Sequence, residues 1–139
     1  MTGCATADDK GKGLIELAEE VCAAEGINPP TITWRRWRNQ RRLDTTGEAY
    51  VSGGVRQLSL WTGADKQERK ITLLHELTHL IVGCAQGHSD FFWDKAFELY
   101  ARYGLTERAL RSEEVYRKGA TRAYERRRAR RRDDERSHE

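Results

Sequence analysis

Near the start of the chain, hydrophobic positions recur at the three- and four-residue spacing of an amphipathic helix. They are Leu14, Leu17, Ala18, Val21 and Cys22. Gly26 is suited to cap the C-terminal end of this helix, and Pro29-Pro30 prevents its continuation. We therefore expect a first helix that ends near residue 25 and packs its apolar stripe against a core.

The pattern then changes to the β-branched and aromatic composition that is typical of strands. Thr31 to Trp37 predicts one strand, and Glu48 to Ser52 and Val55 to Trp61 predict two more. Gly53-Gly54, between the last two, is typical of a two-residue hairpin turn. From this pattern we expect a small antiparallel β-sheet of about three strands.

Helical spacing returns after Thr62-Gly63, where Asp65 is suited to cap a long helix that reaches Val82. The second half of this helix, residues 71–82, is apolar on nearly every side. Its exceptions are two histidines, one glutamate and two threonines. Because a helix of that composition is normally buried, we expect it to lie at the centre of the fold.

Two further helices complete the predicted order of elements. Ser89 or Asp90 can cap the first of them, which carries an aromatic-rich stripe. The second is expected to run from about Glu107 to beyond Tyr124. A helix, a hairpin sheet and then several helices together indicate an α+β fold.

Length and composition suit one domain. The chain has 139 residues, of which 37% are hydrophobic and 34% charged. No apolar run approaches the roughly 18 residues of a membrane span, and the first residues lack the pattern of a signal peptide. The three cysteines show no CxxC spacing, which fits a cytoplasmic location. We expect a disordered start at 1–11, a domain at 12–124 and a charged, arginine-rich C-terminal tail at 125–139.

Three of the four histidines are concentrated around the helix that we expect to be buried. His75 and His79 are four residues apart, so their side chains lie on one helix face and can bind a single Zn²⁺. Glu76, beside the first histidine, lies near such a metal without having to bind it. Burying these polar groups is costly unless something satisfies them. The sequence therefore predicts a zinc site of the HExxH type.

A catalytic zinc site takes three protein ligands and keeps its fourth position for water. His88 is the first candidate for the third ligand, because the helix stops at Gly83 and a loop with Gly87 can bring His88 back. Glu98, on the following helix, is the second candidate, since carboxylates are zinc ligands in other hydrolases. We expect His88, because imidazole is the commoner ligand in this kind of site.

These residues predict the hydrolysis of peptide bonds. Zinc lowers the pKa of its water from 15.7 to about 7 and polarises a substrate carbonyl. Glu76 is then the general base that accepts the proton and the acid that delivers it to the leaving amine. Tyr50, Tyr100 and Tyr103 are candidates for stabilising the oxyanion by residue type alone.

The run from His75 to His79, followed by His88-Ser89-Asp90-Phe91-Phe92-Trp93, resembles the SprT-like metallopeptidases and their small zincin relatives. The resemblance covers about residues 55–103. It implies a zincin-like fold, zinc held by the three histidines, and Glu76 as the base. It also implies that the strand Val55–Trp61 runs beside the active-site cleft, where a substrate peptide could add to it as an extra strand.

The compact single domain also resembles peptidases of phages and mobile elements. One such group, the ImmA-like peptidases that cleave repressors, has a similar run, here from Gln67-Glu68-Arg69 to His79. This resemblance suggests, as an alternative, a peptidase with one narrow protein target.

A non-catalytic binding module, in which zinc only stabilises the fold, is the alternative from another class. Ten basic residues against three acidic ones lie between Arg111 and Arg132, so this segment could contact the phosphates of a nucleic acid. A second basic cluster at 35–42 is interleaved with Trp34 and Trp37, which could stack on unpaired bases. The simpler interpretation is a solvated helix face for the first cluster and core packing for Trp34.

Overall fold

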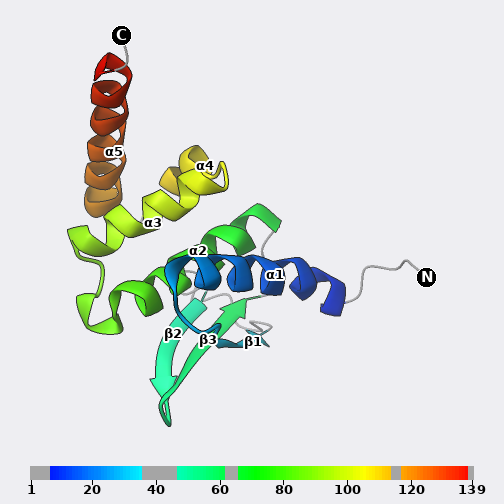
Figure 1. The fold of residues 1–139 in the computed structure, drawn as a ribbon. Coiled ribbons are helices and arrows are strands. Elements are labelled where there is room, and N and C mark those ends of the chain that lie inside the picture. Colours follow the sequence, from blue (N-terminus) through cyan, green and yellow to red (C-terminus); the bar gives the residue numbers. More distant parts are fainter. Residues whose placement is uncertain (1–6, 36–46, 62–65, 114–116, 138–139) are drawn as a thin grey trace.

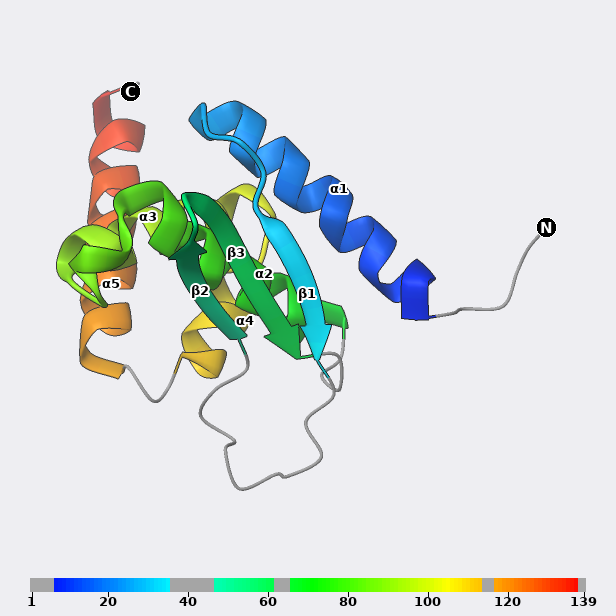
Figure 2. The same ribbon diagram turned by 90° about the horizontal axis from the view of Figure 1, so that it is seen from below.

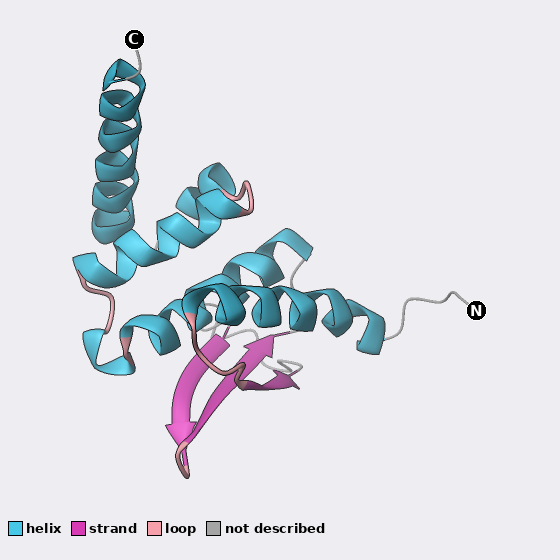
Figure 3. Cartoon of the chain, viewed as in Figure 1, coloured by secondary structure: helices cyan, strands magenta, loops and turns pink. Residues whose placement is uncertain are grey.

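The computed structural model describes residues 7–35, 47–61, 66–113 and 117–137 (Figure 1). Within these ranges, five α-helices and a three-stranded sheet form an α+β fold, which confirms the α+β class that the order of elements predicted. The strands lie together on one side of the molecule and helices make up the rest (Figure 3). None of the helices in the described ranges combines the length and the apolar character needed to cross a membrane.

The first helix, α1 (Ala7–Glu25), ends as the sequence predicts, at a glycine in a left-handed conformation. Its apolar stripe is buried in the core. The helix already begins at Ala7, within the segment 1–11 that we expected to be disordered.

The sheet consists of β1 (Thr31–Arg35), β2 (Gly47–Ser52) and β3 (Val55–Trp61), in the order β1-β3-β2. Strands β2 and β3 are antiparallel and are joined by Gly53-Gly54, both with positive φ, as the hairpin signal predicts. Strand β1, however, pairs with β3 in parallel, so the sheet is mixed and the prediction of a fully antiparallel sheet is wrong. The hairpin turn fixes only the pairing of β2 with β3, whereas the edge that β1 joins depends on tertiary packing.

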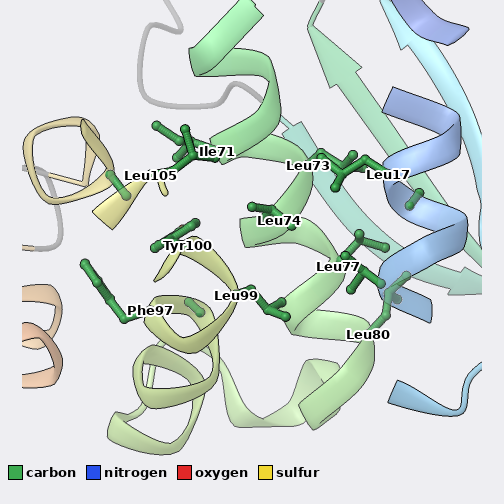
Figure 4. Packing of buried hydrophobic residues seen from close by; sticks show 14 of the residues in the cluster. Leu17, Ile71, Leu73, Leu74, Leu77, Leu80, Phe97, Leu99, Tyr100 and Leu105 are labelled. Carbon is green, nitrogen blue, oxygen red and sulfur yellow. The ribbon is translucent and has the colours of Figure 1, made fainter. Parts of the chain in front are cut away.

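Helix α2 (Lys66–Val82) lies on one face of this sheet, beside α1 (Figure 2). Its leucines pack on two sides. Figure 4 shows Leu73, Leu77 and Leu80 pointing towards α1, and Leu74 pointing towards the later helices. The prediction that this helix is buried is therefore confirmed. The predicted cap, Asp65, lies outside the described residues.

Helix α3 (Asp90–Arg102) packs against the other side of α2. Its N-cap is Ser89, whose hydroxyl accepts a hydrogen bond from the backbone N–H of Phe92 at 3.3 Å. Two helices then follow where one was expected. Helix α4 (Thr106–Ser112) stops at Glu113, and α5 (Arg117–Ser137) packs against α3. The segment expected as a charged tail is thus helical up to Ser137.

Candidate metal centre

The fold brings the three predicted histidines together. His75 and His79 project from consecutive turns of α2, as their spacing requires. The chain then passes through a short 3-10 helix, η2 (Cys84–Gln86), and turns back at Gly87, whose φ of 57° favours glycine. This turn places His88 beside α2, so that one ring nitrogen from each histidine lies within 4.8 Å of the others.

One pair of these nitrogens has the spacing of two ligands on a single metal ion. The Nε2 atoms of His75 and His88 are 3.1 Å apart. Two imidazole ligands at about 2.0–2.1 Å from a tetrahedral zinc have nitrogens about 3.3 Å apart. Among the described residues, this is the group of side chains that can hold an ion, and it does not include Glu98. Three histidines close enough to bind a metal ion are therefore present.

Two aromatic side chains of α3 pack against the histidine rings. Phe92 stacks on His79, with ring centroids 4.3 Å apart, and Trp93 stacks on His88 at 5.6 Å. Both Phe92 and Trp93 are fully buried. Because the rings are enclosed on this side, the conformations of His79 and His88 are restricted before any ligand binds.

Glu113 is a member of the centre that sequence reasoning missed. Its Oε1 accepts a hydrogen bond from Nδ1 of His75 at 2.8 Å and another from the hydroxyl of Tyr100 at 2.7 Å. With its hydrogen on Nδ1, neutral His75 presents an unprotonated Nε2 towards His88. A carboxylate behind a metal-binding histidine is a common way to fix the tautomer and the ring orientation.

The early end of α4 explains how Glu113 reaches His75. Glu113 follows the last residue of α4, and its backbone N–H still bonds Ala109 at 2.8 Å. Helix α4 is attached to the start of α2 by Glu68, which accepts bonds from Arg108 at 3.0 Å and from Ser112 at 2.6 Å. Because Glu113 and His75 are 38 residues apart, no local pattern in the sequence could predict their contact.

Glu76 is a buried residue of α2 next to His75. It lines an open cleft of about 420 Å³ together with His79, Cys84 and residues 48–50 of β2. Burial raises the pKa of the Glu76 carboxyl to about 7, although the adjacent His75 acts in the opposite direction. A carboxyl group with a pKa near neutrality can both accept and release a proton.

The two histidines nearer to solvent are held in the neutral form. Burial, with the charge of His75 as a second cause, lowers the pKa of His79 to about 4 and also lowers the pKa of His88. Burial alone would lower the pKa of His75 too, but the hydrogen bond and charge of Glu113 outweigh it and raise that pKa. Neutral imidazole is the form that binds metal.

The remaining candidates are the three tyrosines considered for the oxyanion and Glu98, considered as a metal ligand. Tyr100 is fully buried and donates its hydroxyl to Glu113, so it is a support of the centre and not an oxyanion donor. Tyr103 faces Glu20 and Arg102 instead. Tyr50 is 38% exposed and lines the cleft, so it alone among these three tyrosines is available to a substrate there. Glu98 pairs with Lys95 at 2.6 Å, away from the histidines.

The strand beside the cleft is β2 rather than the expected Val55–Trp61. Strand β3 is paired on both sides, so it has no free edge to offer a peptide. Within the described residues, strand β2 is an edge strand, and its residues 48–50 line the cleft with Glu76. Strand β3 lies in the centre of the sheet because β1 pairs with one of its edges and β2 with the other.

Comparison with known proteins does not assign a family. No protein-family model matches the chain, and neither a curated protein nor a solved structure matches it.

Proposed function

We propose that this protein is a zinc-dependent metallopeptidase in which His75, His79 and His88 hold the ion and Glu76 is the general base. The observation that carries the proposal is the convergence of three ring nitrogens within 4.8 Å, with Glu113 behind His75 and Glu76 on the cleft side. A solely structural zinc site would not require an acid with a raised pKa on an open cleft.

The bound ion would supply Lewis acidity, which acidifies a water and polarises a carbonyl. Glu76 would take up the proton of the attacking water and return it to the leaving amine, since its pKa of about 7 permits both steps. Glu113 would keep His75 in the Nδ1–H tautomer and the correct orientation. Tyr50 would approach the oxyanion from β2.

A zincin-like fold and a relationship to SprT-like peptidases belong to the same proposal. The motif His88-Ser89-x-x-Phe92-Trp93 has a physical explanation that supports it. Ser89 caps α3, while Phe92 and Trp93 stack on His79 and His88. The serine and both aromatic residues therefore serve the histidine cluster, which is a reason for them to occur with an HExxH helix.

The substrate would be an extended peptide or protein segment. Among the described strands, β2 lies at an edge of the sheet beside the cleft, where an extended chain could add as a further strand. The peptide bond would then lie near Glu76. An enzyme with a narrow target, such as a repressor, would use the same edge but require a particular partner sequence.

The first test is the metal content of purified protein, measured in the parent, in His88→Ala and in Glu98→Ala. We expect about one zinc per chain in the parent and in Glu98→Ala, and a large loss in His88→Ala. A parent chain without stoichiometric metal would refute the proposal.

The second test is Glu76→Gln. As an enzyme, this variant should retain zinc and lose hydrolysis of a casein or peptide-library substrate by several orders of magnitude. If the chain is a non-catalytic binding module, parent and variant will behave alike in every assay. Activity on one protein and not on casein would favour the narrow-target alternative.

A further inference from the structure

A second hollow of the surface lies far along the chain from the histidine cluster, between α5 and the α3–α4 junction. It measures about 300 Å³. Four arginines of α5 line it, at positions one turn apart: Arg127, Arg128, Arg131 and Arg132. Tyr124 and Glu107 line the side near α4, and Glu135 lies at the far end. We call this hollow the arginine groove.

The arginines of α5 divide into two groups with different environments. Arg122 and Arg126 form ion pairs with Asp90 and Asp94 of α3 at 3.1 and 2.7 Å, which attach α5 to the domain. Within the described part of the chain, the four arginines of the groove form no such pair with a carboxylate. The Nε of Arg127 is buried and has no hydrogen-bond acceptor there. These guanidinium groups are therefore available to an external anion.

We infer that the arginine groove binds the phosphate backbone of a nucleic acid. The guanidinium group is a planar fork that binds phosphate oxygens in pairs, which the point charge of lysine does not do. Arg127 and Arg128 lie one helical turn, about 6 Å, from Arg131 and Arg132. Phosphates two steps apart on one strand of a duplex are separated by a similar axial distance, at about 3.4 Å per step. A phosphate oxygen would also satisfy the buried Nε of Arg127.

Other polyanionic surfaces fit the groove less well. A membrane-bound helix inserts large apolar side chains beside its basic ones. Ala120 and Ala123 of α5 are buried, and the exposed large hydrophobic residues of the described chain lie on other elements. Two acidic residues also line the groove. Glu107 accepts a hydrogen bond from the Tyr124 hydroxyl at 2.9 Å, whereas Glu135 would repel a phosphate. Removing the charge of Glu135 should therefore strengthen binding.

The test is fluorescence anisotropy of the full-length protein with a labelled 20-base-pair DNA duplex at 50, 100 and 200 mM NaCl. Four phosphate contacts predict a slope of log K against log salt of about −3 to −4. In the double variant Arg128→Gln/Arg132→Gln, we expect the slope to become less negative by about 2 and the affinity at 100 mM to fall about tenfold or more. Glu135→Gln should bind more tightly than the parent.

A matched control removes the same two charges from the same helix outside the groove. Arg122 pairs with α3, and Arg130 does not line the groove, so Arg122→Gln/Arg130→Gln should change affinity less than threefold. Circular dichroism of both double variants checks that α5 remains folded. The inference does not depend on the proposed peptidase activity, because the readout requires neither metal nor hydrolysis.

Three outcomes would overturn the inference. The first is no binding of the duplex at 50 mM NaCl. The second is an equal loss of affinity in the groove variant and in the control, which would indicate general attraction by net charge. The third is tighter binding of polyglutamate than of DNA, which would identify an acidic protein as the ligand of the groove.

Discussion

Nδ1 of His75 lies 2.8 Å from Oε1 of Glu113, although the two residues are 38 positions apart. The same oxygen accepts the Tyr100 hydroxyl, so the carboxylate is fixed from two directions. Both partners are buried, which strengthens these hydrogen bonds relative to those at the surface. The side chain of His75 is thereby oriented by a segment that belongs to the end of α4.

Replacing Glu113 should weaken metal binding without removing a proposed ligand. We expect Glu113→Gln to lower zinc affinity about 10- to 100-fold, because the neutral amide is a weaker acceptor for the Nδ1–H of His75. Competition with a chromophoric chelator measures the affinity. Glu98→Gln removes a carboxylate of α3 outside the cluster and should leave it unchanged. Equal affinities in all three proteins would show that Glu113 does not support the centre.

Gly119 of α5 leaves no room for a side chain. A Cβ there would lie 2.6 Å from the indole of Trp93, which is fully buried and stacks on His88. We expect Gly119→Ala to destabilise the fold by about 1–2 kcal/mol, since overpacking outweighs the helix propensity of alanine. Urea unfolding measures this change.

The control for that prediction is Gly13→Ala in α1. A Cβ at Gly13 would meet nothing within 4 Å, so the same substitution should stabilise the protein by about 0.5–1 kcal/mol. Effects of the same sign at both positions would contradict the close packing of α5 on Trp93.

In the metal-free protein, the contribution of Glu76 to stability should decrease as the pH rises from about 4.5 to 7. Burial raises the pKa of Glu76 from 4.5 to about 7, so the folded state binds the proton more tightly than the unfolded state does. This contribution is complete below pH 4.5 and is lost as the carboxyl ionises. Its size is about 3 kcal/mol, at about 1.36 kcal/mol per pKa unit.

Urea unfolding in EDTA, compared between the parent and Glu76→Gln across this range, isolates the effect of Glu76 from that of the histidines. The stability of the parent relative to the variant should decrease with pH. A constant difference would show that Glu76 titrates alike in the folded and unfolded states.

Glu25 should contribute stability with the opposite pH dependence. A hydrogen bond from Lys95 at 2.8 Å, together with Arg102 at 3.2 Å, lowers the pKa of this carboxyl at the end of α1. The contribution is present above pH 4.5 and is lost as the pH falls through the lowered pKa. Glu25→Gln should therefore cost about 1 kcal/mol at pH 7 and almost nothing at pH 2–3, as measured by thermal unfolding.

Local patterns predicted the elements that depend on neighbouring residues. The hairpin at Gly53-Gly54, the cap at Ser89 and the buried helix α2 are examples. The spacing of His75 and His79 follows from the helix alone. In the second basic cluster, at 35–42, Arg35 is the last residue of β1, whereas the other residues of the cluster, with Trp37, lie outside the described residues; its role stays a prediction.

The division between α4 and α5 was not predicted, because the residues from 107 onward keep an acceptable helical pattern across the break. The parallel pairing of β1 was missed for a related reason. Strand propensity describes one segment, whereas the choice of a partner edge depends on the whole sheet. Both features affect the metal centre. The break between α4 and α5 positions Glu113, and the pairing of β1 with β3 leaves β2 as the strand at the cleft.

The sequence by itself determined the α+β order of elements, the pair of imidazoles on one helix face and the acid beside them, because helical periodicity acts over a few residues. Only the tertiary structure decided that His88 rather than Glu98 completes the cluster, that Glu113 and Tyr100 support it, and that four arginines of α5 share a groove. Those relationships join residues far apart in the chain, and they arise from burying apolar surface between whole elements, which no local pattern specifies.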